Sequence, residues 1–210
     1  MEELIYRDED HTYWLGDKQL PCVSNIVKSL SKDYSKIPID TLNRKKNLGK
    51  AFHYAIHLFL MNDLDFDSLD EDLIEPMRGF QEFWSNDEFK NKSTSELLFI
   101  NENMDIEKPS YHKKLLYAGT PDLIIPTTVY DWKLRKFDPI ADPLRMAGYE
   151  YLAGEPKNKV VVCFDKDGYY SQYEKELENP NAWGVFRKCL EKYNSDIGFN
   201  LLCEKWRKSV

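Results

Sequence analysis

The stretch YAGTPDLIIPTTVYDWKLRK, residues 117–136, restricts the fold of this chain more than any other. Two short apolar runs flank a turn at residues 126–128, a pattern that predicts two paired β-strands. Asp122, Asp131 and Lys133 interrupt these runs at positions that would otherwise suit a packed sheet. Buried charges need partners, so the stretch predicts either an ion-paired cluster or a functional site.

Strict alternation in VYDWKLRK separates the charged side chains of the second strand from the apolar ones. Asp131, Lys133 and Arg135 share one face, because successive side chains of a strand point to opposite sides. With this turn, Asp122 lies opposite Asp131, within one residue, and directly paired positions are ~5 Å apart. Two partly buried carboxylates at that spacing repel each other unless a cation lies between them. The cation is either the ammonium of Lys133 or a metal ion, and the hairpin alone leaves both open.

The composition is that of a soluble globular domain. Hydrophobic residues make up 42% and aromatic residues 14% of the 210 residues, which favours one folded domain over residues 1–210. Because the start is acidic and no long apolar run is present, we expect no signal peptide and no membrane span. The four cysteines form no C-x-x-C pair, so we expect no iron–sulfur cluster, no zinc ribbon and a reducing cytoplasm. The net charge of −7 disfavours a nonspecific nucleic-acid coat but does not exclude a local basic groove.

Hydrophobic periodicity predicts helices around a central run of strands. An N-terminal hairpin turns at Gly16-Asp17 and leads into a short helix from about Ser24. The other expected elements, in chain order, are helices over 38–61 and 75–89, a strand over 93–104, the charged hairpin, a helix over 143–154, a strand–turn–strand unit over 159–177 and a helix over 181–193. This order predicts an α/β (α+β) fold, a mixed sheet of about five strands with helices on both sides, and not a doubly wound parallel sheet.

The charged hairpin matches a nuclease motif. Its PD at 121–122 and DWK at 131–133 resemble the PD-(D/E)XK motif, here on a strand–turn–strand. Three more stretches follow the order of the RecB-like branch of that superfamily: HTYWLGDKQLPCVSNIV, GKAFHYAIHLFL with His53, and SELLF with Glu96. From about residue 6 to 190 the chain therefore resembles RecB-like nucleases, which include phage recombination exonucleases and mitochondrial genome maintenance exonuclease.

The resemblance implies a restriction-endonuclease-like core and a metal-dependent DNA nuclease. One or two Mg²⁺ or Mn²⁺ ions would be held by Glu96, Asp122, Asp131 and His53, while Lys133 would orient water or the phosphate. DNA is the implied partner; an oligomer and a recombination partner protein are compatible with the resemblance. The expected activity is exonucleolytic, in recombination or end processing in the cytoplasm of a bacterium or phage-infected host, although an endonuclease would need the same residues. The alternative is a nuclease-fold protein that has lost catalysis and binds nucleic acid or a host protein.

One helix departs from the family pattern. RecB-like enzymes usually carry Gln-x-x-x-Tyr after the lysine strand, whereas the aligned helix here reads LRMAGYEYL. Tyr149 is kept, but Arg145 stands in place of the glutamine, so a neutral amide becomes a permanent cation. Arg145 can still contact a DNA phosphate, but a role that needs a hydrogen-bond acceptor would be lost.

Basic residues gather near these positions. The segment NRKKNLGK leads into His53, and more positive charge follows Lys133. We expect DNA contacts from Arg44, Lys45, Lys46, Lys50, Arg135, Lys136, Arg145 and Tyr149. The alternative for the charge run is a solvated helix face. His53 and His57 have the i, i+4 spacing of zinc ligands, but without an H-E-x-x-H motif or an evident third ligand we expect no zinc.

Overall fold

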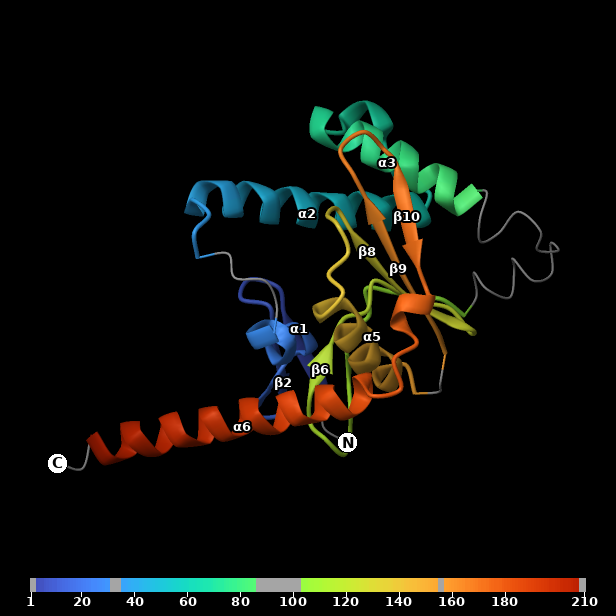
Figure 1. Cartoon of the computed structure of the whole chain (residues 1–210). Coiled ribbons are helices and arrows are strands. Elements are labelled where there is room, and N and C mark those ends of the chain that lie inside the picture. Colours follow the sequence, from blue (N-terminus) through green and yellow to red (C-terminus); the bar gives the residue numbers. More distant parts are fainter. Residues whose placement is uncertain (1–2, 31–34, 86–102, 155–156, 208–210) are drawn as a thin grey trace.

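A five-stranded mixed sheet lies at the centre of the protein (Figure 1). The structure is a computed structural model that describes residues 3–30, 35–85, 103–154 and 157–207, with side chains of the last helix described as far as residue 195. In the strand order β10-β9-β8-β7-β4, β8 and β9 are parallel and the other neighbours are antiparallel. The strands are β4 (Asp105–Ile106), β7 (Leu123–Ile124), β8 (Thr128–Lys133), β9 (Asn158–Phe164) and β10 (Tyr170–Tyr173). The expected mixed sheet of about five strands is confirmed.

Helices cover both faces of this sheet, as the sequence predicts (Figure 1). One face packs against α2 and α3, and the other against α1, α5 and α6. The helices are α1 (Val23–Val27), α2 (Ile39–Leu60), α3 (Glu71–Phe83), α5 (Ala141–Leu152) and α6 (Ala182–Arg207), with short 3-10 turns at Lys28–Leu30, Phe66–Ser68 and Lys175–Leu177. The sheet therefore separates two apolar clusters.

The side chains of β8 show how the sheet divides these clusters. Tyr130 and Trp132 are buried beneath α2 and α3, and the ring of Trp132 lies 5.4 Å from Phe80 and 5.8 Å from Phe83 between centroids. Val129 belongs to the cluster on the opposite face. Each aromatic ring removes about 150–250 Å² from water. This packing fixes β8 and, with it, the charged residues that alternate with the aromatic ones.

Helix α3 begins earlier than expected from the sequence. It starts at Glu71 and not at residue 75, because Asp70 caps it: the Asp70 carboxylate accepts a hydrogen bond from the N–H of Asp72 at 2.9 Å. The end of the expected helix, and nearly all of the strand expected over 93–104, lie outside the described residues.

Helix α6 begins where expected but is longer. It runs from Ala182 to Arg207, although the apolar spacing that predicts it ends near residue 193. Its first turns pack Phe186 and Leu190 into the same cluster as α1 and α5. Although α6 has 26 residues, neither it nor any other helix in the described ranges is apolar enough over a sufficient length to cross a membrane.

The N-terminal segment forms an antiparallel sheet of its own. The expected hairpin consists of β2 (Thr12–Leu15) and β3 (Lys18–Leu20), and its turn residue Gly16 has a φ of 55°, which glycine adopts readily. A further strand that the sequence did not reveal, β1 (Leu4–Arg7), pairs with β2. β5 (Ser110–Tyr111) and β6 (Ala118–Gly119) form a separate two-stranded antiparallel sheet, and Ala118 forms a parallel bridge with Cys22, just after β3.

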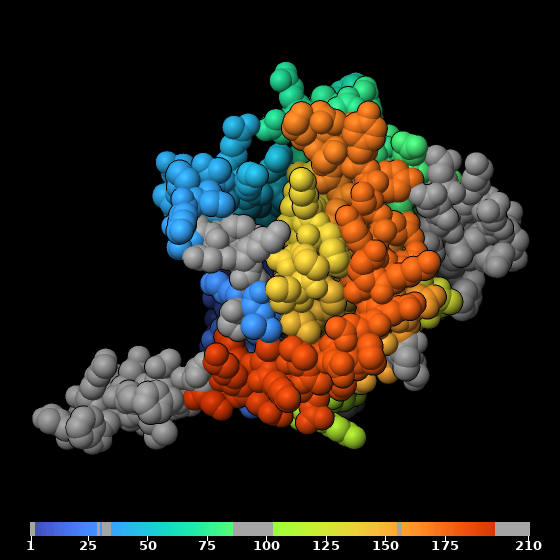
Figure 2. Space-filling model, viewed as in Figure 1, coloured from blue at the N-terminus to red at the C-terminus, as the bar shows by residue number. Residues whose placement is uncertain are grey.

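The expected turn between β9 and β10 is also present, and it docks against α3 (Figure 2). Gly168 in this turn has a φ of 84°. A Cβ atom at Gly79 of α3 would lie 2.0 Å from the carbonyl oxygen of Gly168, so the two backbones approach as closely as only glycine permits.

Candidate active site

The β7–β8 hairpin places two carboxylates beside each other. Leu123 pairs with Tyr130 and Ile124 with Val129, and this register continues to Asp122 opposite Asp131. The N–H of Trp132 donates to Oδ2 of Asp122 at 2.6 Å, which fixes that carboxylate on the hairpin. The predicted pairing of the two acids is therefore confirmed.

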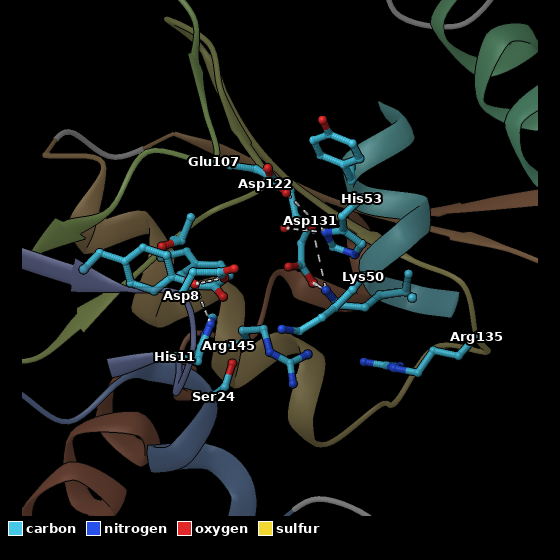
Figure 3. A pocket seen from close by; sticks show the side chains of 16 residues that line it. Asp8, His11, Ser24, Lys50, His53, Glu107, Asp122, Asp131, Arg135 and Arg145 are labelled. Atoms are coloured by element: carbon cyan, nitrogen blue, oxygen red, sulfur yellow. Dashed lines mark hydrogen bonds and ion pairs between the residues drawn. The ribbon is translucent and has the colours of Figure 1, made fainter. Parts of the chain in front are cut away.

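A pocket of about 670 Å³ opens at these carboxylates (Figure 3). It lies between α2, α5 and the N-terminal sheet, so segments far apart in the sequence contribute to it. Of the expected site residues, the pocket brings together Lys50, His53, Asp122, Asp131, Lys133, Arg135, Arg145 and Tyr149. The helical spacing of α2 turns His53 toward the two aspartates, while Phe52 and Ile56 face the core.

Asp122 is held in its ionised form by two basic side chains. Its Oδ1 lies 3.2 Å from Nδ1 of His53, and its Oδ2 lies 3.8 Å from Nζ of Lys133. Burial alone would raise the pKa of Asp122, but the charges of His53 and Lys133 outweigh burial and hold that pKa well below its ordinary value. In return, the Asp122 carboxylate outweighs the effect of burial on His53 and raises the pKa of the imidazole.

Asp131 has a different environment. Its side chain is 1% exposed, and burial, reinforced by the negative charge of Asp122, raises its pKa despite the ammonium of Lys133. Nζ of Lys133 lies 2.7 Å from Oδ2 as an ion pair. Within the described part of the chain, neither Asp131 oxygen accepts a well-aligned hydrogen bond. A buried carboxylate without such bonds is costly to the fold, which makes Asp131 a candidate ligand-binding group.

Glu107 is a third carboxylate in the pocket, and the sequence did not reveal it. Its Oε1 lies 3.9 Å from Nδ1 of His53 and its Oε2 lies 3.6 Å from Nδ1 of His57. Its N–H donates to the carbonyl of Asp122 at 3.0 Å, and its φ of 44° is uncommon for a residue other than glycine. Burial, and then the charge of Asp122, raise the pKa of Glu107. The glutamate expected in this role, Glu96, lies outside the described residues.

The other side of the pocket is basic. Arg135 and Arg145 both bind the carboxylate of Asp142, whose side chain is completely buried in the first turn of α5. Lys50 is exposed on α2 and lines the same pocket. Tyr149, one turn beyond Arg145 on α5, is buried and lines it too. Asp122, Asp131 and Glu107, with His53 and Lys133 among them, form the acidic half of the pocket, and Arg135, Arg145 and Lys50 line the part beside it (Figure 3).

The remaining basic residues expected to contact DNA lie outside the pocket lining. Lys45, Lys46 and Lys136 are exposed. Arg44 forms an ion pair with Asp72 at 2.8 Å, with both side chains at least half exposed. An exposed pair of this kind contributes little to stability, because water screens both charges. It therefore does not prevent Arg44 from contacting another partner, and the DNA contacts of these four residues stay a prediction.

The acidic half of the pocket has the type of side chain that binds divalent cations. Asp122 and Asp131 supply carboxylate oxygens, which Mg²⁺ and Mn²⁺ prefer, and the oxygens of Asp131 have capacity for a ligand. Among the described residues, no three His, Cys, Asp or Glu side chains converge closely enough to hold a metal ion. The ammonium of Lys133 lies between the two aspartates, so a metal ion would have to replace it there.

In comparison with known proteins, the chain matches no family model and no curated protein.

Proposed function

We propose that this chain is a metal-dependent DNA nuclease of the RecB-like PD-(D/E)XK type that hydrolyses phosphodiester bonds. One observation carries the proposal: two adjacent buried carboxylates and a lysine project from a β-hairpin into an open pocket, and among the described residues Asp131 is held only by its ion pair with Lys133, without a well-aligned hydrogen bond. An ion pair that served only the fold would not need a pocket lined by both acids and cations. Exonuclease action in recombination or end processing is the form that the sequence resemblance favours.

The metal would be held by Asp122 and Asp131, and His53 would support it by orienting the Asp122 carboxylate. A bound Mg²⁺ or Mn²⁺ lowers the pKa of its water and stabilises negative charge on the phosphate oxygens. The third carboxylate is either Glu96, from the resemblance, or Glu107, which lies 3.9 Å from the His53 imidazole. Comparing Glu96→Gln with Glu107→Gln decides between them.

Lys133 would change partners during the reaction. In the free protein its ammonium neutralises Asp131, at 2.7 Å. A divalent cation held by the two aspartates would take over this neutralising role, and the Lys133 ammonium would then be free to face the pocket. There it would orient the attacking water or offset charge that develops on the phosphate.

His53 would act through its proton. Asp122 raises the pKa of the imidazole and lies 3.2 Å from Nδ1, so the protonated form is favoured while Asp122 is ionised. In this state Nδ1 holds Asp122 in a fixed orientation. The other nitrogen of the protonated ring is also a donor, and it can bind a phosphate oxygen.

Incubation of linear DNA with Mg²⁺ or Mn²⁺, with EDTA as the control, tests the activity directly. Lys133→Ala should reduce the cleavage rate by about 10²–10³, the typical effect of removing one positioned electrostatic group. Lys166→Ala is the matched control, because Lys166 is 86% exposed in the β9–β10 turn, remote from the pocket lining. Cleavage by Lys133→Ala at the wild-type rate contradicts the role given to Lys133.

The alternative is a nuclease-fold protein that binds nucleic acid or a host protein without cleaving. The ion pair between Lys133 and Asp131 and the replacement of glutamine by Arg145 are compatible with it. DNA that is bound but stays intact with either metal would favour this alternative.

A further inference from the structure

The strongest feature that the proposed chemistry does not use is the buried Asp142 with its two arginines. Arg135 donates from Nη1 to Oδ2 at 2.9 Å and from Nη2 to Oδ1 at 2.5 Å. Arg145 donates from Nη1 to Oδ1 at 2.7 Å, and the N–H of Asp138 donates to Oδ2 at 2.7 Å. Both oxygens of Asp142 are thus fully used, and two guanidinium groups share one carboxylate.

The cluster therefore carries a surplus positive charge. Burial would lower the pKa of Arg145, but the charges of Asp131 and Asp142 raise it, so the guanidinium stays charged although its side chain is only 14% exposed. The effect of Asp131 also shows that Arg145 lies within electrostatic range of the acidic half of the pocket.

The guanidinium of Arg145 has further N–H donors available at the pocket. A guanidinium has five N–H groups, and in the described ranges only Nη1 of Arg145 has an acceptor. The residue lines the pocket, and Figure 3 shows its guanidinium group and the ammonium of Lys50 extending into the same region from α5 and α2. Lys50 is exposed and forms no ion pair with a described residue. A forked guanidinium and an ammonium that line one pocket from two different helices are suited to an oxyanion, above all a phosphate.

The position of the Arg145 guanidinium relative to the aspartates is fixed. Asp142 and Arg145 are linked across one turn of α5, while Arg135 belongs to the segment that follows β8. The bonds to Asp142 thereby tie α5 to the end of the strand that carries Asp131 and Lys133. An anion bound by Arg145 would therefore lie at a fixed position beside the acidic half of the pocket.

We propose that Arg145 and Lys50 form a phosphate-binding subsite that holds a backbone phosphodiester of the DNA next to the bond that is cleaved. The identity of the ligand rests on the proposed nuclease function. Binding of the phosphate group itself needs only the two cations, so the subsite works without a metal ion. The arginine that departs from the family pattern would then serve substrate binding in place of the expected glutamine.

The test measures binding in EDTA, without any cleavage. Two probes are titrated into the protein by calorimetry at constant ionic strength: inorganic phosphate, and a dinucleoside monophosphate that has one internal diester and no terminal phosphate. Wild type should bind both, Arg145→Gln should bind them at least tenfold more weakly, and Lys50→Gln should show a smaller loss. Arg187→Gln is the matched control, because Arg187 is a half-exposed arginine on α6 outside the pocket lining, and it should bind like wild type.

The melting temperature of each variant, measured without ligand, serves as the control for correct folding. Arg135 still binds Asp142 with two hydrogen bonds in Arg145→Gln, so that variant should fold; if it does not, Lys50→Gln, at an exposed position, decides alone. Wild-type protein that binds neither probe, or variants that bind like wild type, overturn the subsite. Binding of inorganic phosphate without the diester overturns its assignment to the DNA backbone. Arg145-dependent binding of both probes by a protein that cleaves no DNA would keep the subsite and reject the nuclease activity.

Discussion

Asp131 and Asp142 are two buried aspartates near one pocket, and they have opposite surroundings. The oxygens of Asp142 accept four hydrogen bonds, from two arginines and the backbone, whereas among the described residues Asp131 has only the ion pair with Lys133 at 2.7 Å and no well-aligned hydrogen bond. Burial favours the protonated form of both, but the guanidinium groups lower the pKa of Asp142, while the pKa of Asp131 is raised. A satisfied buried carboxylate supports the fold, and an unsatisfied one is tolerated where a ligand can complete it.

The largest expected effect tests the structural half of this comparison. Asp142→Asn should destabilise the protein by about 3 kcal/mol, because removing one partner of a buried pair leaves charge uncompensated. We place the effect at the lower end of the usual range because the Arg135 side chain is 34% exposed. Urea unfolding at neutral pH measures it. Asp72→Asn is the control, since it removes an exposed Asp–Arg pair and should cost far less stability than Asp142→Asn; equal losses in the two variants would contradict the structural role of Asp142.

The second prediction tests the functional half. In EDTA, Asp131→Asn should be as stable as wild type or more so, because the substitution removes a buried charge whose pKa is raised. Mg²⁺ or Mn²⁺ should stabilise wild type by about 2.7 kcal/mol at 100 times the dissociation constant, and most of that gain should be absent in the variant. Thermal melts with EDTA and with each metal measure both quantities. If wild type gains nothing from metal and the variant is simply less stable, the hairpin acids serve the fold through their ion pair and the nuclease proposal loses its physical basis.

The third prediction follows from the opposite pKa directions. The pKa of Asp142 is lower in the folded state, so its contribution is present above the unfolded pKa of about 3.9 and is lost as pH falls through the folded value. The pKa of Asp131 is higher in the folded state, so stability falls as pH rises from about 3.9 toward that value. Each pKa unit of difference corresponds to about 1.4 kcal/mol.

Unfolding free energies between pH 2 and pH 7 in EDTA separate the two groups. In Asp142→Asn, the unfolding free energy should rise less as pH increases toward about 3.9. In Asp131→Asn, it should fall less as pH increases above about 3.9. Asp122 also has a lowered pKa and keeps some of the acid-side rise in both variants. Parallel profiles for wild type and both variants would show that neither group is perturbed by its surroundings.

The local parts of this site follow from the sequence. Alternation along β8 predicts that Asp131 and Lys133 share a face, and the short turn predicts that Asp122 lies opposite Asp131. The register of β7 and β8 and the pocket lining agree with both predictions. Helical spacing likewise predicts α2 and the face that carries His53. These features depend on neighbours within one element or one hairpin, where periodicity is informative.

Contacts between segments that are distant in the sequence could not be predicted from the sequence. Glu107 reaches the pocket through a backbone φ of 44° and a two-residue strand, which leave no periodic signal. Asp142 reads as an ordinary acid in the first turn of a helix, and its pairing with Arg135 depends on how the segment after β8 bends back. The sequence therefore predicts Arg145 as an unusual residue without indicating which carboxylate holds it.

The smallest expected effect concerns the basic face of α2, where the same contrast between paired and unpaired charge applies. Replacing Arg44, Lys45, Lys46 and Lys50 by Gln should weaken DNA binding and flatten its salt dependence by about 0.9 logarithmic units for each phosphate that the variant no longer neutralises. Lys50→Gln alone should account for about one such phosphate, because this lysine lines the pocket and has no ion pair in the described part of the chain. Arg44→Gln alone should change the slope least, because Arg44 lies outside the pocket lining and a phosphate contact would replace its ion pair with Asp72 at 2.8 Å. Binding isotherms at several salt concentrations in EDTA give the slopes. An unchanged slope in the fourfold variant would mean that this charge run is a solvated helix face, and that the pocket receives its substrate without help from α2.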